Sequence, residues 1–515
     1  MNVAIIGAGL AGLTAAYELR RLSEAEGVTD LRVDVYEATD RIGGKLYTVA
    51  FEAGPTDMGA EAFIARRKDA VEFFTELGLG DSLVEPSGLR SLVWVDGTAR
   101  ELPTGGVMGI PSSSEGVKHL VSEETARRID QEGEQPGFEW EIGGDVNLGA
   151  LVRERYGNEV VDNIVTALLG GVYSCTADDL GVRATVPQLA AELDRLAADG
   201  PVHLSTAVAN LEAARRELPT GHGAVFNSFR EGYQEVYEAL AEQSGANIYI
   251  DAFISALTRD GAGYRLKGGE DVVYDHVILA VPAPTAALLL KSVAPEASAA
   301  LKSVQLANSA VVGMRFATDE GLPQNSGVLV ANDAQDVHAK AFTLSSRKWP
   351  HLAARGGALV RASFGRFGDT VALSASEDDL VDWALDDLRT ITGFDGREAG
   401  LEEIYVQRWF GGLPRFDATH LTTVATVKQL LADAWAGAGA GGDSAGGAGA
   451  GAGGDSAGGA GGAGVSVTGA AGAGGPGGEG AAGAGVSVTG AWVAGVGVPA
   501  VIADARAVAA DVLKS

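Results

Sequence analysis

The chain has 515 residues, of which 46% are hydrophobic and 21% charged, and this length can build two or three globular domains. Its formal net charge of −29 at pH 7 argues against polyanionic partners, so we expect no nucleic acid and at most peripheral membrane contact. The single cysteine, Cys175, excludes an intramolecular disulfide and leaves no thiolate cluster for a metal, so no metal site is predicted.

The N-terminal segment predicts a strand, a glycine turn and a helix in direct succession. Residues 2–6 are a short β-branched run, residues 7–12 read Gly-Ala-Gly-Leu-Ala-Gly, and residues 13–22 carry apolar side chains at helical spacing. A second predicted strand at 31–36 is followed by an acid, Glu37. In such a unit the helix N-terminus binds a pyrophosphate and the acid accepts hydrogen bonds from a ribose, so the segment predicts a dinucleotide site.

The same N-terminal strand bears on the location of the protein. Because the fold begins at the first residues, we expect no signal peptide. The longest apolar stretches, 278–290 and 490–503, are short and broken by Pro or Gly, so neither is predicted to span a membrane. These observations favour a cytoplasmic protein.

The residues after Glu37 distinguish a nicotinamide from a flavin dinucleotide. They read Ala-Thr-Asp-Arg-Ile-Gly-Gly-Lys over 38–45, with an arginine and paired glycines directly after the acidic strand. This motif resembles the second fingerprint of the FAD-dependent amine oxidase and protoporphyrinogen oxidase superfamily. The resemblance implies FAD as the cofactor, with the arginine and the glycine backbone holding the pyrophosphate from its other side.

The rest of the chain alternates between helical and strand-rich regions. The pattern is mainly helical from 122 to 218, strands recur between 247 and 283, and strands alternate with turns from 309 to 368. A helix at 377–388 precedes a strand at 403–409. Residues 436–485 are almost entirely Gly and Ala with internal repeats, and this composition predicts a flexible insertion.

Further landmarks follow the two fingerprints in a fixed order. They are Leu102–Pro111, Ser346–His351, Arg408-Trp409, Leu413–Phe416 and Thr489–Pro499. Together these motifs resemble the porphyrinogen oxidases of haem biosynthesis, and the likeness is greatest to the Gram-positive bacterial type that acts on coproporphyrinogen III. The resemblance covers nearly the whole chain outside 436–485.

This resemblance implies an α/β fold and a division into domains. The fold would be a Rossmann-type FAD-binding domain of the amine oxidase superfamily, with a mixed-sheet substrate domain and an inserted helical domain. We expect the FAD-binding domain at 1–90, 222–285 and 403–515, with 436–485 as its flexible insertion. The helical domain is expected at 91–221 and the substrate-binding domain at 286–402.

The resemblance also implies a reaction. Oxygen-dependent oxidation would convert coproporphyrinogen III to coproporphyrin III and release hydrogen peroxide. The flavin carries the difficult chemistry, so we expect no catalytic side chain, and the protein mainly positions the macrocycle. The implied partners are the porphyrinogen and molecular oxygen, and the resemblance leaves open a role for other haem-pathway enzymes.

Individual site residues are carried over from the family motifs. The predicted cofactor-binding residues are Gly7, Ala8, Gly9, Leu10, Ala11, Gly12, Glu37, Ala38, Arg41, Gly44, Lys45, Gly59, Ala60, Glu61, Ala62, Ile254, Trp409, Val496, Gly497 and Val498. Of these, 59–62 would lie near the flavin, Ile254 would hold the adenine, Trp409 would lie in the cofactor domain, and 496–498 would cap the isoalloxazine. The predicted substrate-binding residues are Arg66, Arg67, Lys68 and Gly171. Cations suit the propionates of the substrate, and Gly171 would face its reacting carbon.

Several alternatives stay open at this point. The chain departs from the family pattern at Ser174-Cys175-Thr176 and at Val493-Ala494, close to the residues that would set substrate preference. One alternative is a protoporphyrinogen IX oxidase. Another is an amine oxidase or carotenoid desaturase with the same cofactor fold, and a third is a flavin-binding partner without turnover. Amine oxidases often hold their flavin through a cysteine near the C-terminal motif, where this chain has none.

Overall fold

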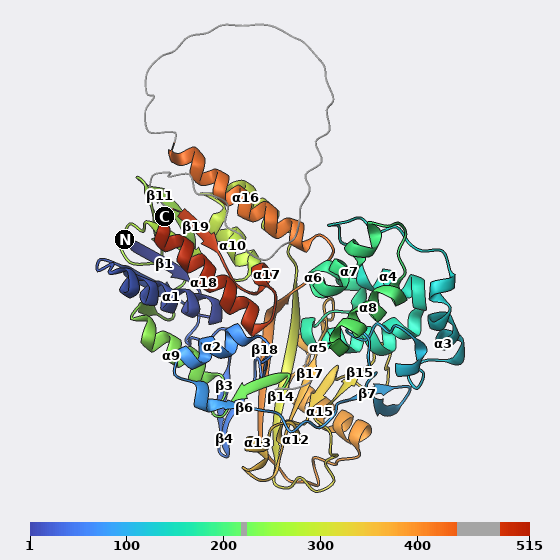
Figure 1. The fold of residues 1–515 in the computed structure, drawn as a ribbon. Coiled ribbons are helices and arrows are strands. Elements are labelled where there is room, and N and C mark those ends of the chain that lie inside the picture. Colours follow the sequence, from blue (N-terminus) through green and yellow to red (C-terminus); the bar gives the residue numbers. More distant parts are fainter. Residues whose placement is uncertain (218–223, 440–484) are drawn as a thin grey trace.

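The computed structural model describes residues 1–217, 224–439 and 485–515 (Figure 1). Its elements form three parts: a parallel sheet with its helices near both termini, a second sheet below it, and a group of helices to one side (Figure 1). The expected flexible insertion at 436–485 lies outside the described residues, except for 436–439 and 485.

The first part is organised around a five-stranded sheet in which every neighbouring pair is parallel. In spatial order its strands are β10 (Asn247–Tyr249), β2 (Arg32–Tyr36), β1 (Asn2–Ile6), β13 (His276–Leu279) and β19 (Gly485–Val488). The apolar runs of β1 and β13 are buried, as expected for strands covered by helices on both faces.

Helices cover both faces of this sheet. Each strand contributes to both cores, because its successive side chains point to opposite faces. Val3 and Ile5 share a core with α1 (Leu10–Glu26), α2 (Lys68–Glu76), α9 (Gln234–Ser244) and α18 (Val498–Lys514). Ala4 and Ile6 share the opposite core with α10 (Ala283–Leu290), α11 (Pro295–Leu301), α16 (His420–Gly439) and the hairpin of β11 (Ala256–Asp260) and β12 (Gly263–Lys267).

The second part is a seven-stranded mixed sheet, with β15 and β7 parallel and the other pairs antiparallel. In spatial order its strands are β18 (Leu401–Pro414), β14 (Leu306–Phe316), β17 (Ala358–Phe364), β16 (Ala341–Thr343), β15 (Gly327–Val330), β7 (Leu92–Val95) and β8 (Thr98–Glu101). One face packs against α15 (Glu377–Thr392), which begins with a capping box between Ser376 and Asp379. The shorter helices of this part are α12 (Ser345–Lys348), α13 (Pro350–Ala353) and α14 (Val371–Ser374).

The sheets divide the chain differently from the expected domain boundaries. β18 was expected in the FAD-binding domain, but it pairs along its length with β14 of the seven-stranded sheet. β7 and β8 belong to that sheet too, although the helical domain was expected to begin at 91. Conversely, α10 and α11 pack on the five-stranded sheet rather than in the expected substrate domain. Strand pairing is decided by tertiary contacts, which an alternating pattern of side chains does not specify.

The third part is helical, and its core also includes Val93 and Val95 of β7 from the second sheet. Its helices are α3 (Glu123–Asp130), α4 (Leu148–Tyr156), α5 (Thr166–Tyr173), α6 (Val182–Thr185), α7 (Pro187–Ala197) and α8 (Leu204–Glu217). A π-helical segment, Val160–Val165, directly precedes α5. Single 3-10 turns lie at Ser114–Gly116, Glu132–Glu134 and Ala177–Asp179.

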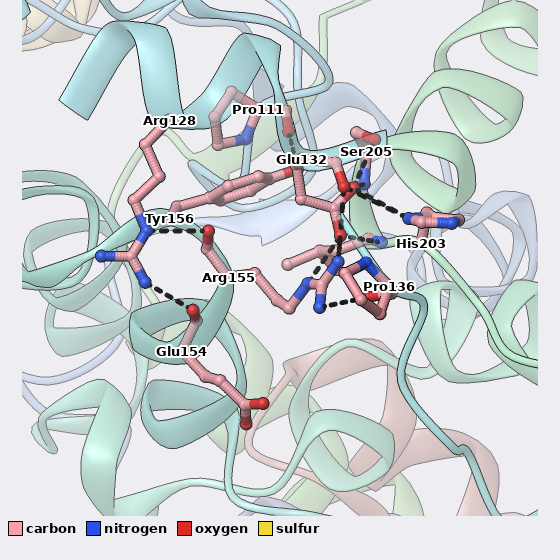
Figure 2. Close-up of polar contacts among 10 residues, drawn as sticks. Pro111, Arg128, Glu132, Pro136, Glu154, Arg155, Tyr156, His203 and Ser205 are labelled. Atoms are coloured by element: carbon pink, nitrogen blue, oxygen red, sulfur yellow. Dashed lines mark hydrogen bonds and ion pairs between the residues drawn. The ribbon is translucent and has the colours of Figure 1, made fainter. Parts of the chain in front are cut away.

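A buried ion pair holds the helical part together (Figure 2). The carboxylate of Glu132 accepts hydrogen bonds from Arg155 Nε at 2.7 Å, from the backbone N–H groups of Leu204 and Ser205 at 3.1 Å each, and from Ser205 Oγ (Figure 2). It therefore caps the N-terminus of α8 while neutralising Arg155. The neighbouring Tyr156 donates from its hydroxyl to the carbonyl of Pro111 at 2.9 Å, which anchors the Leu102–Pro111 landmark.

Small elements connect the three parts. They are the hairpin of β3 (Thr48–Phe51) and β4 (Gly54–Asp57), the pairs that β9 (Phe226–Phe229) makes with β5 (Phe63–Ile64) and β6 (Leu83–Val84), the turn Gly80–Ser82, and α17 (Ala491–Ala494). Among the helices in the described ranges, none has the length and apolar character required to cross a lipid bilayer.

Candidate flavin and substrate site

The glycine turn between β1 and α1 has the tight geometry that its sequence predicts. Gly7 has a φ of 105°, and a Cβ on this residue would lie 2.5 Å from the carbonyl oxygen of Ala280. A Cβ on Gly12 would lie 1.9 Å from the carbonyl oxygen of Gly7, so only glycine lets α1 start this close to β1. Gly9 is the N-cap of α1, and it leaves the first turn of the helix uncovered by a side chain.

Glu37 lies beside this turn at the end of β2. Its Oε2 accepts a hydrogen bond from the backbone N–H of Ala8 at 2.9 Å. Its Oε1 accepts from the N–H and the hydroxyl of Thr39, at 3.0 Å and 2.9 Å. The carboxylate is half-buried and its neighbour Ala38 is exposed. Each carboxylate oxygen can accept more than one hydrogen bond, so Oε2 can also accept from a ribose hydroxyl.

The second fingerprint lies directly against the first. The N–H of Gly43 donates to the carbonyl of Ala8 at 2.8 Å, and Gly44 has a φ of 59°. A Cβ on Gly44 would lie 2.8 Å from the Cα of Gly9, so a side chain there would fill the space between the two turns. These residues fit a pyrophosphate held between two glycine backbones, as the FAD prediction requires.

The two cations of the second fingerprint form bonds within the protein. The guanidinium of Arg41 donates to the carbonyls of Ile42, Gly44 and Leu46 at 2.7–3.3 Å, so it braces the turn. It also lies 4.0 Å over the ring centre of Tyr47. Lys45 Nζ donates to the carbonyl of Gly411 at 3.1 Å, and burial lowers the pKa of Lys45 to about 8.

The segment 59–62 passes next to the second fingerprint. A Cβ on Gly59 would lie 2.0 Å from the carbonyl oxygen of Lys45, so the two backbones touch. The N–H of Ala60 donates to the same carbonyl at 3.4 Å, while Ala62 is half-buried. This contact places 59–62 beside the predicted pyrophosphate site.

Glu61 has partners that the sequence analysis did not identify. Its carboxylate accepts from Lys348 Nζ at 3.1 Å and from Ser345 Oγ at 2.9 Å, and Arg361 Nη1 lies 3.8 Å away. Burial by itself would raise the pKa of Glu61, but Lys348 and Arg361 lower it to about 2. Arg361 also donates to the carbonyl of Gly59 at 2.9 Å. The side chain of Glu61 therefore ties the segment 59–62 to the second sheet. The sequence signal that could have revealed this partner is the Ser346–His351 landmark, which contains Lys348.

The other predicted cofactor residues come from distant parts of the chain. Trp409 lies on β18 in the seven-stranded sheet, not in the cofactor domain, and its Nε1 donates to the carbonyl of Met58 at 3.0 Å. Ile254 is buried in the same core as Tyr36 at the end of β2. Gly497 is the N-cap of α18, Val498 begins that helix, and Val496 packs against the core of the helical part.

The predicted substrate residues fall into two groups. Arg66, Arg67 and Lys68 are all exposed at the start of α2, and Arg67 forms an ion pair with Asp69 at 2.6 Å. Gly171 lies in the last turn of α5 and is exposed. The nearby thiol of Cys175 is buried, which raises its pKa to about 12, so it is a poor nucleophile.

Comparison with known proteins identifies the family. A family model described as flavin containing amine oxidoreductase matches residues 10–429. The chain belongs to this family. It is therefore an FAD-dependent oxidoreductase, and the cofactor predicted from the second fingerprint is confirmed.

Two relatives bear out the resemblance seen in the sequence. The coproporphyrinogen III oxidase of Mycobacterium tuberculosis is 40% identical over 437 residues, which are 84% of this chain and 91% of that protein. The protein of the same name from Bacillus subtilis is 28% identical over 445 residues, 85% of this chain and 92% of that protein.

Solved structures confirm the predicted fold class. A structure from Exiguobacterium sp. 255-15, named as a protoporphyrinogen oxidase, superposes with a TM-score of 0.77 at 24% identity and covers 100% of this chain and 99% of that one. Putrescine oxidase superposes with a TM-score of 0.63 at 15% identity, with 100% of both chains covered. At these identities the likeness concerns the fold alone.

Proposed function

We propose that this protein oxidises coproporphyrinogen III to coproporphyrin III, with molecular oxygen as the electron acceptor and hydrogen peroxide as the second product. The observation that carries the proposal is the 40% identity, over 84% of the chain, to a coproporphyrinogen III oxidase. Bound FAD would supply the two-electron redox chemistry, so the work of the polypeptide is to bind and orient.

The described residues support a division of roles in cofactor binding. The Gly7–Gly12 and Gly43–Gly44 turns would hold the pyrophosphate, and Glu37 would accept from the ribose. The segment 59–62 would face the flavin, held in place through Glu61 and Arg361. Val496–Val498 would cover the ring at the start of α18.

Substrate recognition is the second role. Coproporphyrinogen III carries four carboxylates, and the exposed Arg66 and Lys68 would pair with those at the rim of the macrocycle. Gly171 has no side chain, so the macrocycle could approach the end of α5 closely. The net charge of −29 would keep the protein away from anionic lipid, which supports a cytoplasmic enzyme acting on a dissolved substrate.

The test is a comparison of substrates on the FAD-loaded protein. Coproporphyrinogen III, protoporphyrinogen IX and a panel of primary amines and polyamines are supplied in air, and porphyrin fluorescence and peroxide are followed. We expect the highest kcat/KM with coproporphyrinogen III. A higher kcat/KM with protoporphyrinogen IX, peroxide from amines alone, or a flavin that no porphyrinogen reduces under anaerobic conditions would each contradict the proposal.

A further inference from the structure

The end of α5, where Gly171 lies, is held by a contact that the proposed function does not use. Ser174 follows the helix as its C-cap and has a φ of 52°, in the left-handed region. Its side chain is buried, and its carbonyl accepts a hydrogen bond from the N–H of Phe367 at 2.7 Å.

The partner of Ser174 is a buried lysine, Lys340, which is only 6% exposed. Its Nζ donates to Ser174 Oγ at 2.6 Å and to the carbonyl of Gly365 at 2.6 Å. Its backbone is fixed in the second sheet, because its N–H donates to the carbonyl of Ser363 at 2.8 Å and its carbonyl accepts from Val330 at 3.0 Å. Hydrogen bonds therefore fix both the backbone and the ammonium group of Lys340.

The charge of Lys340 has an unusual environment. Its ammonium donates to two neutral oxygens, the Ser174 hydroxyl and the Gly365 carbonyl, and the carboxylate of Asp369 acts on it electrostatically. The ammonium lies at the C-terminus of α5, the negative end of the helix dipole. Burial, together with the nearby guanidinium of Arg366, lowers the pKa of Lys340 to about 7, although Asp369 acts in the opposite direction. Burying an ammonium is unfavourable, and an apolar side chain of similar size would fill the same space without the desolvation penalty.

At the end of α5, a Cβ added to Gly170 or Gly171 would come into ordinary van der Waals contact with its neighbours. A Cβ on Gly170 would lie 3.4 Å from the carbonyl oxygen of Cys175 and 3.6 Å from Arg366 Nε. A Cβ on Gly171 would lie 3.5 Å from Leu329 Cδ2 on β15. Ser174 and Gly171 belong to the same final turn of α5, because the N–H of Ser174 donates to the carbonyl of Gly170 at 3.0 Å, so a shift of Ser174 displaces Gly171 with it.

We propose that Lys340 is a positioning residue for the porphyrinogen, acting through Ser174 on Gly171. The inference rests on the proposed function. The Lys340–Ser174 contact sets the height of Gly171 above the second sheet, and thus the placement of the macrocycle carbon that would meet the flavin. Small displacements of a reacting atom have large effects on rate, so the contact acts mainly on kcat.

The test is a double-mutant cycle with Lys340→Met and Ser174→Ala, assayed with coproporphyrinogen III. Each single variant is expected to lower kcat about tenfold with little change in KM. The double variant is expected to fall no further than the more impaired single one, because both remove the same contact. Ser174→Asn is expected to recover most of kcat, since asparagine tolerates the left-handed backbone and its side-chain carbonyl can accept from Lys340.

A matched control separates positioning from stability. Ser298 is also buried, and its hydroxyl donates to the carbonyl of Ala287 at 2.6 Å, but it lies on α11 against the first sheet. Ser298→Ala is expected to lower Tm about as much as Ser174→Ala while leaving kcat and FAD content unchanged. Binding of coproporphyrin III, followed by the absorbance of the flavin, gives a readout independent of turnover and should be weakened less than kcat falls.

Each outcome decides the inference. If kcat stays within about twofold of wild type, if the two substitutions are additive, or if the control loses the same activity, Lys340 has no positioning role. If the wild-type protein forms no coproporphyrin at all, the proposed function fails and this inference fails with it. Turnover by the wild type with unchanged variants overturns this inference alone.

Discussion

Replacing Glu37 tests the cofactor site most directly. Glu37 Oε2 accepts from Ala8 at 2.9 Å, while Oε1 accepts twice from Thr39. Oε2, on the side of the glycine turn, is therefore the oxygen that can best accept a further hydrogen bond from a ribose hydroxyl. Glu37→Ala removes that acceptor and its charge together.

The expected size of the effect follows from this geometry. A hydrogen bond to a charged group contributes about 1.5–3 kcal/mol, so Glu37→Ala should weaken FAD binding by roughly 10- to 150-fold. Thr39→Val is the matched control, because it removes the hydroxyl's hydrogen bonds to Oε1 and to the carbonyl of Arg41 and leaves Oε2 and the glycine turn intact. It should change the Kd by less than about threefold.

The assay is titration of the apoprotein with FAD, followed by flavin fluorescence, with the Tm of the apoprotein measured alongside. We expect Glu37→Ala to raise the Kd and to lower the Tm of the apoprotein only modestly. A Kd within about threefold of wild type would refute the reasoning. So would equal effects of Glu37→Ala and Thr39→Val, because the carboxylate would then serve only its own loop.

Three further substitutions test buried carboxylates. Glu61→Gln should lower the free energy of unfolding by about 3 kcal/mol in urea, because Lys348 and Arg361 lose their shared partner. The folded-state pKa of Glu61 is depressed, so its stabilisation is present above about pH 4.5 and lost as the pH falls towards 2; an unchanged acid-unfolding midpoint in the variant would contradict this. Burial raises the pKa of Asp57 from 3.8 to about 6, so its contribution to stability falls as the pH rises between these values. Asp57→Asn should remove that fall and match or exceed wild-type Tm at pH 7, and a large loss of Tm at pH 7 would argue against it. Glu132→Gln strands the buried Arg155 and should cost about 3–5 kcal/mol while leaving the FAD Kd unchanged; a loss below about 1 kcal/mol would show that the network in Figure 2 is dispensable.

The features that the sequence alone determined are those that depend on neighbours along the chain. The strand at 2–6 is β1, and the turn that follows needs glycine because backbone atoms lie within about 2–3 Å of where a Cβ would be. The helix expected at 377–388 is α15, whose start is set by its own capping box. The cofactor could be predicted from residues 38–45 for the same reason, since the two fingerprints follow one another closely.

Only the tertiary structure decided which distant segments meet. The sequence of β18 does not specify which sheet the strand joins. It pairs with β14, so Trp409 lies in the seven-stranded sheet and not in the sheet where it was expected. Glu61 is an acid in a segment expected to face the flavin, yet its side chain pairs with Lys348, which lies 287 residues later in the chain. Lys340 and Ser174 lie far apart in the sequence too, and neither residue is unusual there. A buried charge needs hydrogen-bonding or oppositely charged partners, because desolvation is otherwise unfavourable. Those partners come from distant parts of the chain, so the local sequence does not predict them.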